Sequence, residues 1–298
     1  MGHRPTPEFP AHLNALYRGF PFERSLARDP LSLVRPLARD ARNAEVAGLF
    51  AATLAVGNTT AIRGAFADLM ERAGRDPAGF LGLPLAERRR RLAGFRHRWI
   101  RDDQLVRLSS ALVELADAGE SLESVFVEGR DRTNEFAGGL DALAHRLRSG
   151  GGPGRRPAGY ARLFPSPLDR SRSACKRLTL LMRWLVRPEY PDLGVWRRVA
   201  PRELRVPLDQ HVFWISYHLG LTPRRTRNWP AVEEVTAALR EVDPMDPVKF
   251  DFVLCHTGVS GDCPKERDIA VCGPCVVRPD CLLWRRSSVA RMSVRSAA

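Results

Sequence analysis

The chain has 298 residues, of which 44% are hydrophobic, so it can bury a large core as one large domain or as two lobes. Lysine and arginine total 47 against 34 acidic residues, a formal net charge of +13. This excess favours a polyanionic partner such as nucleic acid, although arginine spread over solvated faces would also produce it. The sequence contains no stretch of about 20 apolar residues, so we do not expect a membrane-spanning helix. The first ten residues lack the apolar run of a secretory signal, and we expect a cytoplasmic, nucleoid-associated protein.

Most of the chain has the periodicity of helix, because apolar residues recur at spacings of three and four. We therefore predict an all-α protein. Residues 43–73 predict two helices separated by a tight turn at Gly57 and Asn58. Further helices are predicted over residues 103–118 and 133–148. The glycine-rich run from Ser149 to Gly154, followed by Arg155, Arg156 and Pro157, is then expected to form a flexible basic loop.

Two later helices begin at residues that could carry chemistry. Lys176 enters the helix KRLTLLMRWLVR, where its first-turn N–H groups could bind phosphate. If Lys176 has no catalytic role, it is expected to contact a phosphate or to be solvated at the start of this helix. Asp209 enters a second apolar helix, and the alternative for it is a helix N-cap. We assign no chemistry to His211, which follows two residues later.

Five of the six cysteines lie in the last fifth of the chain. Because an export signal is not expected, they favour a metal or catalytic role over disulfides. Cys263, Cys272, Cys275 and Cys281 form the pattern C-x8-C-x2-C-x5-C, which is typical of a metal site and favours a 4Fe-4S cluster. Zinc and unliganded thiols are the alternatives. Cys255 is expected to be a buried small hydrophobe.

The order of these residues resembles the helix-hairpin-helix DNA glycosylase superfamily, above all its iron–sulfur enzymes of the endonuclease III type. Lys176 matches the hairpin lysine, Asp209 matches the aspartate motif, and the four cysteines match the cluster ligands. The chain departs from that pattern where the G-x-G turn is replaced by residues 169–173. The archaeal 8-oxoguanine glycosylases are similar at a greater distance. The pieces EVAGLFAATLAVGN, CKRLTLLMRWLVR, VPLDQHV and DPMDPVKFDF resemble more closely a bacterial family catalogued as a domain of unknown function.

The resemblance implies a two-lobed fold. One lobe is a helical barrel over residues 43–148. The other combines residues 1–42 with residues 158–298 and carries the cysteine loop, residues 263–281. Damaged double-stranded DNA is expected to bind in the cleft between the lobes of a monomer, with Lys176 and Asp209 on opposite sides.

The resemblance also implies a reaction. A damaged, oxidised nucleotide is flipped out of the duplex, Asp209 stabilises the sugar cation or removes a proton, and the amine of Lys176 attacks the sugar. One alternative is a non-catalytic protein that binds DNA structure or damage, and another is a protein that binds or modifies RNA. Four tryptophans could stack on a flipped base, although a position in the core is the alternative for each. They are Trp184, Trp196, Trp214 and Trp229. The residues expected to contact DNA are Asn58, Arg170, Arg172, Arg177, Lys265 and Arg267.

Overall fold

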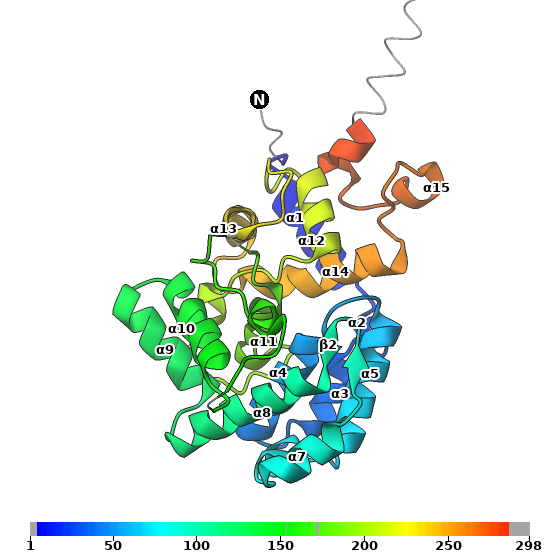
Figure 1. The fold of residues 1–298 in the computed structure, drawn as a ribbon. Helices are drawn as coiled ribbons and strands as arrows, with labels where there is room; N and C mark the ends of the chain where they lie inside the picture. The colour runs from blue at the N-terminus through cyan, green and yellow to red at the C-terminus, as the bar shows by residue number, and fades with distance from the viewer. Residues whose placement is uncertain (1–4, 153, 171–172, 286–298) are drawn as a thin grey trace, which may run out of the picture. The chain divides into compact units, whose positions relative to one another are not determined.

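The computed structural model describes residues 5–152, 154–170 and 173–285. The described residues form mainly helices (Figure 1). The strands found in them are two-residue segments, β1 (Arg96–His97) and β2 (Ile100–Arg101), which pair antiparallel as one short hairpin. The predicted all-α class is confirmed.

The chain forms two compact units. The larger unit is Glu23–Leu204, and the smaller unit joins Met1–Phe22 to Arg205–Ala298. These bounds differ from the predicted lobes, because residues 23–42 and 158–204 belong to the larger unit. The assignment of lobes by resemblance stays a prediction.

The larger unit holds the helices from α2 to α11. They are α2 (Phe22–Leu26), α3 (Leu31–Val34), α4 (Ala41–Leu54), α5 (Thr59–Arg72), α6 (Pro77–Leu81), α7 (Leu85–Leu92), α8 (Asp102–Asp117), α9 (Leu122–Thr133), α10 (Phe136–Ser149) and α11 (Lys176–Val186). Short 3-10 helices lie at Arg35–Leu37, Tyr160–Leu163 and Pro201–Glu203.

The helix α4 is the centre of the larger unit. It is buried at almost every position from Ala44 to Leu54, as expected for a helix that is apolar on all sides. It packs against α3, α5, α6 and α11. The helices α9 and α10 form an antiparallel pair beside this group, and α8 packs against both α7 and α10. The core of the larger unit therefore surrounds α4.

The smaller unit brings the start of the chain against its last third. Its helices are α1 (Phe9–Arg18), α12 (Gln210–His218), α13 (Trp229–Val242), α14 (Phe250–Ser260) and α15 (Ile269–Cys272), with 3-10 helices at Pro247–Lys249 and Arg278–Asp280. The helix α14 packs against α1 and α12. The Phe22 and Phe252 rings stack with centroids 5.7 Å apart, which joins the N-terminal segment to α14.

The carboxylate of Asp280 makes a second link between the chain ends within this unit. It accepts a hydrogen bond from the Thr6 hydroxyl at 2.6 Å and lies 2.8 Å from Nδ1 of His12. Burial raises its pKa, but the bonds from Thr6 and His12 outweigh burial, so the pKa of Asp280 is lowered. The N-terminal helix is thus tied to the cysteine-bearing segment.

Most predicted helices lie where the periodicity placed them. The segment 43–73 forms α4 and α5, separated at Gly57 and Asn58, and the segment 103–118 forms α8. The predicted helix over residues 133–148 begins three residues late, as α10, because Asn134 takes a left-handed conformation with φ 54° and ends α9. No helix of the described residues is long and apolar enough to cross a membrane.

Candidate nucleic-acid interface

Lys176 is the first residue of α11, as predicted. Its side chain is half-buried, and Nζ donates a hydrogen bond of 3.3 Å to the carbonyl oxygen of Ala55, the C-cap of α4. A helix C-terminus favours a cation, so this contact suits the ammonium group. In the described part of the larger unit, Lys176 makes no salt bridge.

Lysine is rare in this chain. Three of the 47 basic residues are lysines, and the others are arginines. Lys249 is ion-paired with Asp243 at 2.5 Å, and Lys265 is exposed in the cysteine-bearing segment. Lys176 is therefore the half-buried lysine that has a carbonyl, rather than a carboxylate, as its partner.

Arg177 follows Lys176 but serves the fold. Its Nε donates to the carbonyl of Thr53 at 3.1 Å, and Nη1 donates to the carbonyls of Arg162 and Leu163. Burial lowers the pKa of the Arg177 guanidinium to about 10, so the group still carries its charge at neutral pH. The printed bonds to these three carbonyls use Nε and Nη1, so this part of the guanidinium is committed to the fold.

The short β1–β2 hairpin of the larger unit presents a ring and a cation at its turn. Trp99 is 39% exposed, and the guanidinium carbon of Arg177 lies 5.4 Å from the centre of its ring. Arg98 reaches Gly57, since a Cβ there would lie 3.0 Å from Arg98 Nε. Gly57 has φ 113°, which side-chain-bearing residues rarely adopt. The hairpin, the turn after α4 and the start of α11 thus form one surface.

We call this surface the Trp99 surface. Its described members are Ala55, Gly57, Asn58, Arg98, Trp99, Lys176 and Arg177. His97 is buried in its base, where Nε2 lies 2.9 Å from the carbonyl oxygen of Val56. Asn58 is exposed, and its side-chain oxygen accepts from the backbone N–H of Ala61 as the N-cap of α5. An exposed aromatic ring beside cations is the composition that nucleic-acid surfaces use.

The tryptophans expected to offer stacking surfaces are mainly core residues. Trp184, Trp196 and Trp229 are buried, and the indole N–H of Trp196 donates to Glu45 at 2.8 Å. Trp214 is half-buried and meets the ring of His218 edge-on. The tryptophan with an exposed ring is Trp99, which is not among the four predicted. The run RHRWIR, with four basic residues around one tryptophan, was the signal that pointed to it.

Asp209 is the N-cap of α12, as the alternative interpretation predicted. One carboxylate oxygen accepts from the backbone N–H of Val212 at 2.8 Å, and the other accepts from the thiol of Cys255 at 3.3 Å. Cys255 is half-buried rather than a fully buried hydrophobe. Because Asp209 belongs to the smaller unit and Lys176 to the larger, their convergence on one groove stays a prediction.

The four later cysteines lie in one compact segment of the smaller unit. Burial and the charges of Cys281, Cys275 and Cys272 raise the pKa of Cys263 to about 12, so the sulfurs are near enough to repel one another when ionised. A bound metal would supply the opposing charge and release the thiol protons. The donor set fits a thiolate-ligated metal in its chemistry.

The geometry of that cysteine segment leaves the ligand unidentified. Among the described residues, no three His, Cys, Asp or Glu side chains converge in a metal-holding arrangement. Backbone bonds order the segment nonetheless: Asp268 caps α15, and the N–H of Cys275 donates to the carbonyl of Cys272 at 3.3 Å. The iron–sulfur cluster stays a prediction that rests on the spacing and the proximity of the thiols.

The remaining residues expected to contact DNA differ in their surroundings. Lys265 and Arg170 are exposed. The guanidinium of Arg267 lies 3.8 Å from the ring centre of Trp284 and is half-buried. Arg172 lies outside the described residues. Two of these cations are therefore open to solvent, and one stacks on an aromatic ring.

Comparison with known proteins gives one match. The model of the family described as protein of unknown function (DUF2400) matches residues 29–260. The four segments that resembled a family of unknown function lie inside this range, and Cys263, Cys272, Cys275 and Cys281 lie beyond it. No curated protein and no solved structure matches the chain. The matched range covers more than half of the sequence, and the chain belongs to the DUF2400 family.

Proposed function

We propose that this protein is a DNA glycosylase with abasic-site lyase activity on a damaged, oxidised base, with Lys176 as the nucleophile. The observation that carries the proposal is that Lys176, one of three lysines among 47 basic residues, is half-buried with a carbonyl oxygen rather than a carboxylate as its partner. An arginine would bind phosphate as well or better, but a primary amine is required to form a Schiff base with a sugar.

In the proposed reaction, the Lys176 nitrogen forms a bond to C1′ of the damaged nucleotide while the bond from C1′ to the base breaks. The attacking nitrogen is the neutral amine, and the base leaves with a proton. The nitrogen then gives up one proton and keeps one, the sugar ring oxygen gains a proton as the ring opens, and a protonated Schiff base results. Loss of a proton from C2′ with departure of the 3′ phosphate then cleaves the strand. Asp209 is the carboxylate that the resemblance assigns to the proton transfer, and it also caps α12.

The Trp99 surface supports a nucleic-acid partner for the larger unit. An exposed indole can stack on an unpaired base, and Arg98 beside it can pair with a phosphate. Stacking of this kind does not depend on sequence, because every base has a π-face. It suits a protein that handles bases flipped out of the duplex.

The test is borohydride trapping on a panel of duplexes, each with one oxidised base. Reduction of a Schiff base fixes the protein to DNA, so we expect a covalent adduct with the parent protein. Lys176→Arg keeps the charge and cannot form the imine, and it should abolish the adduct while DNA affinity stays within about threefold. Lys249→Arg is the matched control, since Lys249 is ion-paired with Asp243 and is not among the expected DNA contacts, and it should still form the adduct.

Two outcomes would refute the enzymatic proposal. An adduct that persists in Lys176→Arg would assign the nucleophile to another amine. A parent protein that forms no adduct and releases no base on any duplex of the panel would leave no role for a nucleophile.

The second candidate is a non-catalytic protein that binds DNA structure or damage. The double use of Asp209, as a helix cap and as the acceptor from Cys255, favours it, since both contacts explain the carboxylate without chemistry. Lys176→Ala would then weaken DNA binding and reduce the salt slope by about one unit, with no turnover in the parent protein.

We also propose that Cys263, Cys272, Cys275 and Cys281 hold a 4Fe-4S cluster, which would brace the segment that carries Lys265 and Arg267. Iron and sulfide analysis and a visible absorption spectrum of anaerobically purified protein test this assignment. About four iron and four sulfide per chain are expected. Stoichiometric zinc without sulfide would instead establish the alternative metal.

A further inference from the structure

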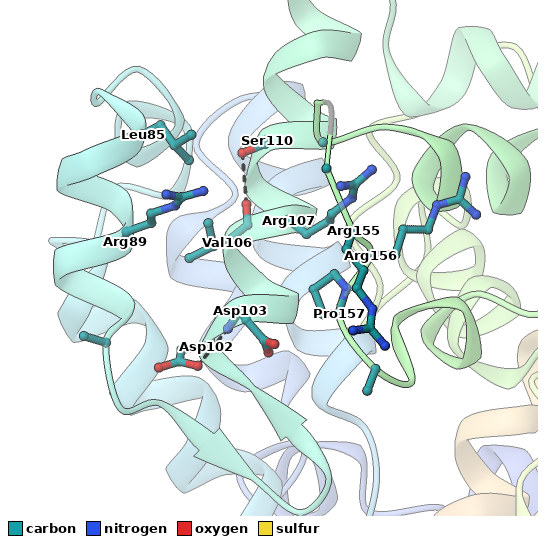
Figure 2. A pocket seen from close by; sticks show the side chains of 14 residues that line it. Leu85, Arg89, Asp102, Asp103, Val106, Arg107, Ser110, Arg155, Arg156 and Pro157 are labelled. Carbon is teal, nitrogen blue, oxygen red and sulfur yellow. Dashed lines mark hydrogen bonds between the residues drawn. The ribbon is translucent and has the colours of Figure 1, made fainter.

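The larger unit contains a cavity of about 840 Å³ (Figure 2). Lys176 is not among the residues that line it. It lies between α7, the first half of α8 and the glycine-rich segment, whose described lining residues are Gly151 and residues 154–158. Its walls are of three kinds: the arginines Arg89, Arg107, Arg155 and Arg156; the polar residues Asp102, Asp103 and Ser110; and apolar residues that include Leu85, Val106 and Pro157. We call it the α7–α8 cavity.

Arg107 is the lining residue whose surroundings most clearly indicate a ligand. It is 8% exposed, and its Nε is buried with no hydrogen-bond partner among the described residues. The contact from Nη2 to the carbonyl of Ser149 is long, at 3.5 Å. A buried guanidinium with an unsatisfied N–H costs free energy unless something else accepts the bond. Figure 2 shows Arg107 reaching from α8 toward the segment that carries Arg155 and Arg156.

The glycine-rich segment is shaped to approach this guanidinium. A Cβ on Gly151 would lie 2.9 Å from Nε of Arg107 and 2.8 Å from its carbonyl oxygen, so a larger residue would have to push the segment away. Glu114 holds the segment in place by accepting the backbone N–H of Gly151 at 2.9 Å. The proximity of Arg107 to this wall is therefore built into the fold.

The carboxylates of the cavity do not neutralise its arginines. Asp102 accepts the backbone N–H groups of Gly94, at 2.7 Å, and of Asp103, at 2.8 Å. Asp103 accepts the backbone N–H of Gln104 at 2.8 Å. Across the described ranges, none of the four cavity arginines forms a salt bridge. The described lining therefore holds four arginines and two carboxylates, a net positive charge.

We propose that the α7–α8 cavity binds a nucleoside polyphosphate, with the phosphates held by Arg107, Arg155 and Arg156. A guanidinium matches phosphate oxygens in pairs, and several of them around one cavity suit a chain of phosphates. The apolar residues give a nucleobase a wall to pack on, and the volume lies in the range of small-molecule sites. This site is independent of the proposed glycosylase chemistry.

Calorimetric titration of the full-length protein with ATP, adenosine, tripolyphosphate and a single-stranded oligonucleotide tests the proposal. ATP should bind, adenosine should not, and tripolyphosphate should bind more weakly than ATP. The double variant Arg155→Ala/Arg156→Ala removes two exposed charges and should raise the Kd for ATP about tenfold or more. Arg107→Gln should raise it at least as far.

The matched control is Arg225→Ala/Arg227→Ala, which removes two exposed arginines from a loop of the smaller unit and should leave the Kd within about twofold. Lys176→Arg should also bind ATP normally, which separates this site from the proposed active site. If Arg107→Gln fails to fold, the exposed double variant still decides the question.

Four results would overturn the proposal. They are no binding of ATP, equal losses in the control and the cavity variants, tripolyphosphate binding as tightly as ATP, and oligonucleotide binding where ATP does not bind. The third result would show that the base is not recognised, and the fourth would assign the cavity to a nucleic-acid strand.

Discussion

Two groups of arginines in the larger unit have opposite surroundings. Arg183 and Arg187 are 3% and 2% exposed, and both guanidiniums bind the buried carboxylate of Asp192, Arg183 at 3.0 Å. The arginines of the α7–α8 cavity come from three segments, and none of them is ion-paired with the carboxylates that line the same cavity. The same side chain thus stabilises the fold in one place and is left for a ligand in the other.

The difference follows from the cost of removing charge from water. A buried guanidinium is tolerated when a carboxylate and hydrogen bonds replace its hydration, as at Asp192. In a cavity that admits solvent or a ligand, water or the ligand can replace the lost hydration of the guanidinium, and a protein carboxylate is not needed. The overall charge of +13 therefore says little about function until each arginine has been assigned to one of these two settings.

The largest effect is expected at the buried cluster. Asp192→Asn removes the charge that Arg183 and Arg187 share, and leaves two buried cations with one carboxylate fewer. The free energy of unfolding should fall by roughly 3–5 kcal/mol, as for other buried ion pairs broken on one side. Urea unfolding at neutral pH measures it. A loss below about 1 kcal/mol would show that the cluster is less desolvated than its burial indicates.

A smaller effect is expected at Arg107. Arg107→Met replaces a buried guanidinium that has an unsatisfied Nε with an apolar chain of similar length. Because no ion pair is broken, the free energy of unfolding should change by less than about 1 kcal/mol, in either direction. Urea unfolding of this variant beside Asp192→Asn sharpens the contrast. A loss as large as that of Asp192→Asn would make Arg107 a structural residue and erase the difference.

The smallest effect is expected at a carboxylate held without an arginine. Glu45 accepts the indole N–H of Trp196 at 2.8 Å and faces the backbone N–H groups of Leu122 and Glu123. Burial raises the pKa of Glu45 from its ordinary value of 4.5, and these bonds offset burial only in part. The folded state thus holds this proton more tightly than the unfolded state does.

The sign of the pH dependence follows from that difference. The contribution of Glu45 to stability is greatest below pH 4.5, declines as the pH rises to the folded-state pKa, and is constant above it. The glutamine of Glu45→Gln cannot ionise. As the pH rises from 4.5 to the folded-state pKa of Glu45, the free energy of unfolding of this variant should therefore increase relative to that of the parent protein. Urea unfolding at a series of pH values measures both proteins. A pH-independent difference between them would contradict the shift.

Helix positions were predictable because they depend on local pattern. The apolar spacing placed α4, α5, α8 and α11, and the start of α11 at Lys176 was correct. The start of α10 was wrong by three residues, because a single left-handed residue, Asn134, decided where α9 ended. One residue's backbone conformation carries no periodic signal.

The candidate sites were predictable only where chemistry is written into spacing. Order and residue type single out the four cysteines, Lys176 and Asp209, and the N-cap alternative for Asp209 is confirmed. Trp99 was missed, since its exposure depends on a two-residue hairpin that lies beside α11. The α7–α8 cavity is not visible in the sequence pattern, because the wall that begins at Gly151 lies 41 residues beyond Ser110, the last lining residue of α8.

The sequence alone determined the all-α class, most helix starts, membership of the DUF2400 family and the compact group of thiols. These depend on periodicity and on residues close together in the chain. Only the tertiary structure decided which cations are neutralised, because a guanidinium finds its carboxylate, or its cavity, through contacts between distant segments. That pairing, rather than the count of arginines, distinguishes the stabilising cluster at Asp192 from the cavity at Arg107.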